Sequence, residues 1–218
     1  MNQKSLKVKG IFLDLDGTIV DSTDAYIEAA AVAFQTVGQK PPEMKTALEI
    51  PKRLEQGFSI SEITNGKTRK FLSTYYRTYY SASSEKTKLI PNVSTTLESL
   101  SQRAKLALIT MRHSPKQAVI KELESFGISQ YFTHVVTALD TAKPKPSPEA
   151  LIDCIKALDV NICDCIIVGD SVSDVRAGKA AGAKTVALLS GLFAFDELVK
   201  EQPDLILDDV NLLPKFID

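Results

Sequence analysis

The sequence lacks the features of an exported, membrane-bound or nucleic-acid-binding protein. Its net charge is only −1, whereas a nucleic-acid-binding protein needs a strongly basic face. No uninterrupted apolar run is long enough to cross a bilayer, and residues 1–5 lack the apolar segment of a signal peptide. We therefore expect a cytoplasmic protein with neither a nucleic-acid nor a membrane partner.

Cysteine is also scarce, and internal repeats and low-complexity tracts are absent. Cys154, Cys163 and Cys165 are odd in number, and none has the Cys-x-x-Cys spacing of a zinc or redox pair. We expect reduced thiols in or near a core, which fits the cytoplasm. The 218 residues, 44% apolar and 24% charged, are ordinary for a globular protein and allow one domain or two.

Two carboxylates directly follow the first apolar run. Asp14 and Asp16 flank Leu15 after residues 11–13, and the chain then turns at Gly17. Such a pair repels itself unless a cation or a shared proton intervenes, and magnesium is the usual oxygen-liganded ion beside phosphates. Asp-x-Asp-Gly also occurs in calcium loops, but the following residues lack the evenly spaced oxygen ligands and final Glu of such a loop. The pattern therefore indicates phosphate chemistry.

Three further apolar runs lead to polar side chains. Residues 106–109 end at Thr110, residues 134–137 lead to Lys143, and residues 165–169 end at Asp170, with Asp174 four residues later. Strands separated by helical stretches predict a parallel α/β sheet, in which ligands gather outside the carboxyl ends of the strands. We expect these polar groups to meet Asp14 and Asp16 in one crevice.

Some of these residues have simpler interpretations. Alone, Asp170 and Asp174 are more typical of caps for a helix that opens at Ser171. Lys143 and Lys145 lie in the same proline-rich loop and compete for one role as a phosphate-binding cation. The prolines should keep this loop extended up to Ser147, with the next helix starting at Pro148.

Taken together, the motifs resemble those of the haloacid dehalogenase superfamily of phosphohydrolases, in the branch of the phosphoglycolate phosphatases. Residues 14–22, DLDGTIVDS, match the first family motif, Thr110 the second, Lys143 with Pro144 the third, and residues 169–174, GDSVSD, the fourth. The similarity covers nearly the whole chain, and the motif alignment favours Lys143 over Lys145.

The resemblance implies a role for each matching residue. Asp14 would attack the substrate phosphorus to form an aspartyl phosphate, and Asp16 would protonate the leaving oxygen and then deprotonate water. Thr110, the backbone N–H of Met111 and Lys143 would bind the phosphate. Arg112 and Arg53 are candidates for further substrate contacts. The expected magnesium ligands are Asp14, Asp16 through its backbone carbonyl, Asp170 and Asp174, the last either directly or through another group.

Residues 22–89 interrupt the strand–helix alternation and read as a run of helices. This segment resembles the small all-helical cap of one family branch, inserted into a Rossmann-like core made of residues 1–21 and 90–218. In the cap, Tyr75 with Tyr79 and Tyr76 with Tyr80 form adjacent i,i+4 pairs, so one pair should pack inward while the other stays partly exposed.

The expected function is a magnesium-dependent phosphatase acting on a small phosphorylated metabolite, as a monomer or homodimer. Residues 48–53, LEIPKR, depart from the Gly-containing turn that the family often has in its cap, which leaves the substrate open. Two alternatives remain: a phosphosugar mutase of the same superfamily, and a catalytically silent phosphate-binding module.

Overall fold

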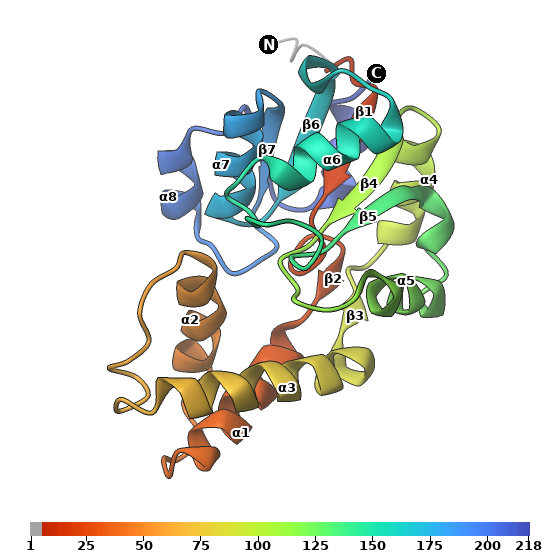
Figure 1. The fold of residues 1–218 in the computed structure, drawn as a ribbon. Coiled ribbons are helices and arrows are strands. Elements are labelled where there is room, and N and C mark those ends of the chain that lie inside the picture. Colours follow the sequence, from red (N-terminus) through yellow and green to blue (C-terminus); the bar gives the residue numbers. More distant parts are fainter. Residues whose placement is uncertain (1–5) are drawn as a thin grey trace. The chain divides into compact units, whose positions relative to one another are not determined.

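Figure 1 shows the computed structural model of the chain, which describes residues 6–218. The expectation about a signal peptide concerns residues 1–5 and lies outside the described residues. The chain divides into two units, one formed by Met1–Val20 with Leu89–Asp218 and the other by Asp21–Lys88. The second unit was expected at residues 22–89, so both of its ends lie one residue earlier than expected. No helix within residues 6–218 combines the length and the apolar character that a membrane span requires.

The first unit is built on a six-stranded sheet with the strand order β5-β4-β1-β6-β7-β8. The strands are β1 (Gly10–Leu13), β4 (Lys105–Ile109), β5 (Phe132–Val136), β6 (Cys165–Gly169), β7 (Lys184–Leu188) and β8 (Leu205–Leu207). Every neighbouring pair runs parallel. This confirms the predicted α/β class, because parallel strands covered on both faces have near-continuous apolar sequences.

Helices cover both faces of this sheet (Figure 1). They are α4 (Val93–Ser101), α5 (Lys116–Ser125), α6 (Glu149–Leu158), α7 (Val172–Ala181) and α8 (Phe195–Leu198), with 3₁₀ turns η1 (Ser129–Tyr131), η2 (Ile162–Asp164), η3 (Val199–Glu201) and η4 (Val210–Lys215). One prediction needs correction, because Pro148 is the N-cap of α6 rather than its first helical residue.

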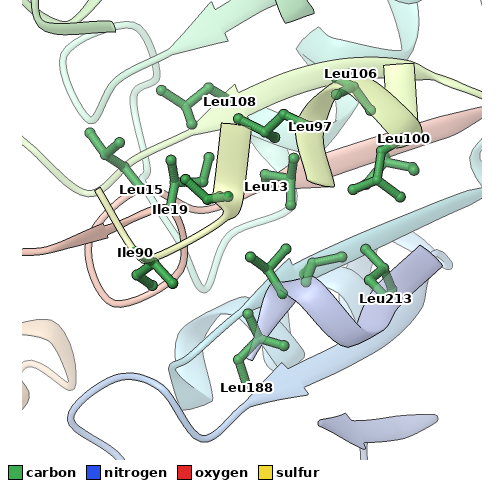
Figure 2. Packing of buried hydrophobic residues seen from close by; sticks show 14 of the residues in the cluster. Leu13, Leu15, Ile19, Ile90, Leu97, Leu100, Leu106, Leu108, Leu188 and Leu213 are labelled. Atoms are coloured by element: carbon green, nitrogen blue, oxygen red, sulfur yellow. The ribbon is translucent and has the colours of Figure 1, made fainter. Parts of the chain in front are cut away.

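Alternate residues of the central strands point to opposite faces. Leu13 of β1 belongs to the cluster that α4, α5 and η4 cover, whereas the adjacent Phe12 belongs to the cluster under α6 and α7. Figure 2 shows the first cluster, with Leu97 of α4, Leu108 of β4 and Leu213 of η4 among its side chains. The sheet is therefore held between two apolar layers, which fixes the positions of its strand ends.

The second unit consists of the helices α1 (Thr23–Thr36), α2 (Met44–Glu55) and α3 (Thr68–Lys86) around a separate apolar cluster. Tyr75 and Tyr79 are buried in that cluster, whereas Tyr76 and Tyr80 are only partly buried, so the expected division of the tyrosine pairs is confirmed. Two short strands, β2 (Val20–Asp21) and β3 (Lys88–Leu89), pair with each other where the chain passes between the units.

Candidate active site

Three aspartates meet at the carboxyl end of the central strands. Asp14 follows β1, and its N–H donates to the Val168 carbonyl at 2.9 Å, while Asp170 follows β6 and Asp174 lies in the first turn of α7. All three are buried, and one carboxylate oxygen of each lies within 4.8 Å of the others. The in-phase ends of β1 and β6, where Leu13 pairs with Val168, bring these carboxylates together.

One buried ammonium group lies against this cluster. Lys145 Nζ donates to Asp14 Oδ1 at 2.6 Å and to Asp174 Oδ1 at 2.5 Å, and it also contacts the Ile109 carbonyl at 3.4 Å. Only 1% of the Lys145 side chain is exposed. Its positive charge is thus shared between two aspartates rather than solvated.

The structure places Lys145 rather than Lys143 against Asp14, whereas the motif alignment favours Lys143 as the phosphate-binding cation. Lys143 is exposed, and its backbone N–H donates to Glu149 Oε2 at 3.0 Å. The expected extended loop is instead a turn, closed by the Ser147 N–H donating to the Pro144 carbonyl at 3.0 Å. Lys145, which lies two residues after Lys143 and within this turn, is thereby directed toward Asp14.

Asp174 caps helix α7 and also contacts the ammonium group of Lys145, while its predicted role as a metal ligand stays a prediction. Its Oδ2 accepts from the N–H of Ser171 at 3.2 Å and from the hydroxyl of Ser171 at 2.6 Å, which completes a capping box on α7. Its Oδ1 accepts from Lys145. Because the cap fixes one oxygen, the other is held toward the cluster.

Two glycines allow the backbone to approach Asp170. Gly17 has φ of +82°, and a Cβ on it would lie 2.6 Å from Asp170 Oδ2, while a Cβ on Gly191 would lie 1.7 Å from the same atom. The loop after β7 closes this side, since Ser190 Oγ donates to the Gly17 carbonyl at 2.7 Å and the Leu192 N–H donates to Asp170 Oδ2 at 3.2 Å. Sequence reasoning missed this loop, because it carries no motif.

Asp16 lies in a second group of charges, which is partly buried. Arg112 donates from Nε to Asp16 Oδ2 at 2.8 Å and from Nη2 to Asp16 Oδ1 at 2.7 Å, and its Nη1 donates to Glu122 Oε2. Arg112 thus contacts two carboxylates, and the substrate contact expected of it stays a prediction. The carboxylate of Asp16 is not part of the three-aspartate cluster, and the metal role predicted for its backbone carbonyl stays a prediction.

The remaining predicted site residues lie in two places. Thr110 is buried at the end of β4, where its Oγ1 accepts from the Arg112 N–H at 3.2 Å, and Met111 follows it half-buried. Arg53 lies on α2 in the second unit, where its Nε donates to Glu49 Oε1 at 3.2 Å. The phosphate and substrate contacts expected of these three residues stay predictions.

The electrostatics of the cluster favour an additional cation. Burial raises the pKa of Asp14 well above its usual value, although Lys145 acts in the opposite direction, and the charges of Asp174 and Asp16 raise it further. Three carboxylates and one ammonium group carry a net charge of −2 when all are ionised. Buried carboxylate oxygens are the ligands that Mg²⁺ and Ca²⁺ prefer, so these residues fit a divalent ion.

Comparison with known proteins identifies relatives along nearly the whole chain. The chain is 31% identical over 219 residues to a phosphoglycolate phosphatase of Pseudomonas fluorescens (strain Pf0-1), covering 95% of this chain and 79% of that protein. It is 30% identical over 227 residues to a phosphoglycolate phosphatase of Vibrio cholerae, covering 98% of each.

Solved structures share the fold. A crystal structure described as a predicted phosphoglycolate phosphatase from Haemophilus somnus 129PT superposes with a TM-score of 0.75 at 24% identity, covering 99% of this chain and 98% of that one. A haloacid dehalogenase-like family hydrolase from Streptococcus pneumoniae gives a TM-score of 0.76 at 22% identity, covering 94% of this chain and 95% of that one.

The family model described as haloacid dehalogenase-like hydrolase matches residues 11–188, a span that begins just before Asp14 and extends past Asp174. The match includes all five of Asp14, Thr110, Lys145, Asp170 and Asp174. This chain belongs to the haloacid dehalogenase-like hydrolases.

Proposed function

We propose that this chain, a phosphoric monoester hydrolase, acts on a small phosphomonoester through an aspartyl phosphate on Asp14. One observation carries the proposal: a buried carboxylate at the end of the central strand shares an ammonium group with a second aspartate and lies near a third. The family match and the names of the relatives agree with this chemistry.

The reaction divides between two aspartates of the β1 loop. A carboxylate oxygen of Asp14 forms a bond to phosphorus while the bond from phosphorus to the ester oxygen breaks, and Asp16 gives a proton to the departing oxygen. Asp16 then takes a proton from water as that water attacks the phosphorus of the aspartyl phosphate and the bond from phosphorus to the Asp14 oxygen breaks. Inorganic phosphate leaves, and both aspartates return to their initial state.

Asp14, Asp170 and Asp174 would hold the metal ion, for which we propose Mg²⁺, with the Asp16 carbonyl as a further ligand. When bound, the ion would supply positive charge that offsets the repulsion between the nucleophile and the phosphate. The cluster has the composition for this role, since its net charge of −2 leaves room for a divalent cation. Its oxygens come from three separate elements, which restrains their geometry.

Lys145 would take the phosphate-binding role that the sequence assigned to Lys143. Its ammonium group already lies beside Asp14 Oδ1, next to the atom that would carry the phosphoryl group. Because an ammonium group is a compact point charge, it can attract phosphate oxygens without the bidentate geometry of an arginine. We propose Thr110 and the backbone of Met111 as the neighbouring donors.

The second unit would act as the cap, with Arg53 as a candidate contact to the substrate's organic part. Phosphoglycolate is the first substrate to test, because the relatives carry that name. A reducing compartment, the cytoplasm, fits the three free thiols. The expectation of a monomer or homodimer stays a prediction.

A phosphate-release screen would test the function. The panel contains phosphoglycolate, sugar phosphates, nucleotides, pyrophosphate and phospho-amino acids, each with and without Mg²⁺. We expect metal-dependent release from at least one monoester, abolished in Asp14→Asn but retained in Asp196→Asn, which changes an exposed aspartate of α8. Isomerisation of a hexose phosphate without phosphate release would favour the mutase, and no turnover of any compound would favour the silent binding module.

A further inference from the structure

A network of buried and partly buried charges joins Asp16, Arg112 and Glu122. The guanidinium of Arg112 donates to both oxygens of Asp16, and a third nitrogen donates to Glu122 Oε2. The exposed fractions of the three side chains are 4% for Arg112, 13% for Asp16 and 11% for Glu122. Asp16 lies in the loop after β1, Arg112 in the turn after β4 and Glu122 in helix α5.

Arg112 is anchored at its backbone as well as at its side chain. Its N–H donates to Thr110 Oγ1 at 3.2 Å, and its carbonyl accepts from the Ala138 N–H at 3.1 Å. Glu122 is fixed independently, because it lies in the middle of α5. The guanidinium therefore connects Asp16 to helix α5, while the backbone of Arg112 is held by Thr110 and Ala138.

We propose that Arg112 and Glu122 are positioning residues that hold the Asp16 carboxylate in the orientation for proton transfer. A bidentate contact fixes both the place and the plane of a carboxylate, which a single hydrogen bond does not. A carboxylate offers about four lone-pair sites. The Arg112 fork contacts each carboxylate oxygen once, which sets the directions of the remaining lone pairs. This inference rests on the proposed function of Asp16.

The same contacts would be a poor device for stability alone. Buried ion pairs often contribute little net stability, because desolvation offsets the attraction between the charges. Here two carboxylates share one guanidinium, and burial raises the pKa of Glu122 despite the opposing effect of Arg112. Glu122 Oε1 is also buried without a hydrogen-bond partner among the described residues. An arrangement with these costs is better explained by the orientation that it imposes on Asp16.

The test compares two leaving groups in Glu122→Gln and Arg112→Lys. The alkyl ester that the screen identifies needs a proton on its departing oxygen, whereas p-nitrophenolate departs without one. The ratio kcat/KM reports the steps up to departure of the alcohol. General acid catalysis contributes about 10²–10⁴-fold, so we expect kcat/KM for the alkyl ester to fall about 10- to 100-fold in both variants. For p-nitrophenyl phosphate, we expect a change of less than about threefold.

A matched control and a double variant complete the design. Arg176 and Glu201 form the same bidentate contact on the surface, at 3.0 and 2.6 Å, so Glu201→Gln should leave both substrates unaffected. If Glu122 acts through Asp16, then adding Glu122→Gln to Asp16→Asn should cause no further loss.

The possible outcomes separate the two proposals. An equal loss on both esters, or an additive loss in the double variant, means that Arg112 and Glu122 only stabilise the fold, and it overturns the inference while the phosphatase function stands. Thermal unfolding of each variant detects a purely structural role directly. The same conclusion follows if one of Glu122→Gln and Arg112→Lys fails to fold while the other hydrolyses both esters at the wild-type rate. A wild-type protein that releases no phosphate from any compound overturns the proposed function and this inference with it.

Discussion

Replacing Lys145 with methionine tests the charge balance of the site directly. Lys145 is the only lysine that the structure places against Asp14 within the described residues, and it donates to Asp14 and Asp174 at 2.6 and 2.5 Å. Methionine has a similar length and removes the charge without leaving a large cavity. Lys143→Met is the matched control, because Lys143 lies in the same loop but is exposed.

The expected loss of stability follows from the burial of the carboxylates. Removing one partner of a buried ion pair costs about 3–5 kcal/mol, because the remaining charge is left uncompensated. The pKa of Asp14 is already raised by burial, so Asp14 can take up a proton and relieve part of this cost. We therefore expect a loss near the lower limit, about 3 kcal/mol at neutral pH without metal.

The loss should shrink as the pH falls. A carboxyl group whose pKa is raised in the folded state favours its protonated form there, and protonated Asp14 no longer needs the ammonium group. Urea unfolding in EDTA at several pH values measures this dependence. In the phosphate-release assay, loss of a preorganised charge should lower kcat about 10²–10³-fold.

The control variant decides between the two lysines. Lys143→Met should unfold like the wild type and retain its activity. The reasoning fails if Lys145→Met unfolds within about 0.5 kcal/mol of the wild type, a difference typical of a surface substitution. It also fails if Lys143→Met loses activity while Lys145→Met keeps it, which would support the choice made from the motif alignment.

Three further predictions concern the metal, the thiols and a surface ion pair. In EDTA, Asp14→Asn should be more stable than the wild type at neutral pH, because ionising a buried acid with a raised pKa costs stability. Mg²⁺ should raise the Tm of the wild type more than that of the variant. An equal increase in Tm would argue against Asp14 as a metal ligand. Burial raises the pKa of Cys165 to about 11, so only about one Cys165 thiol in 1,000 is ionised near pH 8. A thiol reagent should therefore modify the exposed Cys163 well before Cys165. Mass spectrometry of partly modified protein shows the order of modification. The Arg176 contact lowers the pKa of Glu201. Glu201→Gln should therefore lower the free energy of unfolding by at most about 1 kcal/mol above pH 4.5, the ordinary pKa of a Glu, and should have no effect below the lowered pKa. Urea unfolding at one pH above and one pH below this range measures the difference.

The strands of the fold could be predicted because each carries its own signal. Residues 106–109 and 165–169 are continuous apolar runs, which a strand buried on both faces requires, and each lies within an observed strand. The placement of Asp14 and Asp170 then follows from topology, since the carboxyl ends of parallel strands meet at one edge of the sheet.

Residues whose position depends on loop geometry or on distant contacts could not be predicted in this way. Lys143 and Lys145 differ by two positions in one loop, and the turn closed by Ser147 and Pro144 decides which of them faces Asp14. Glu122 is linked to Asp16 through Arg112, which lies ten residues before it in the sequence and outside α5. No local pattern encodes either contact.

The site keeps like charges in a setting that disfavours them. Asp14, Asp170 and Asp174 are buried, and the single ammonium group of Lys145 cannot balance all three. A phosphate dianion that approached this cluster without a further cation would meet a net negative charge in a region of low dielectric, where repulsion is strong. The helix cap on Asp174 and the Leu192 N–H that donates to Asp170 hold these two carboxylates in place against this repulsion. The same restraint makes them a preformed set of oxygen ligands, so binding a cation relieves an existing cost rather than adding the cost of ordering its ligands.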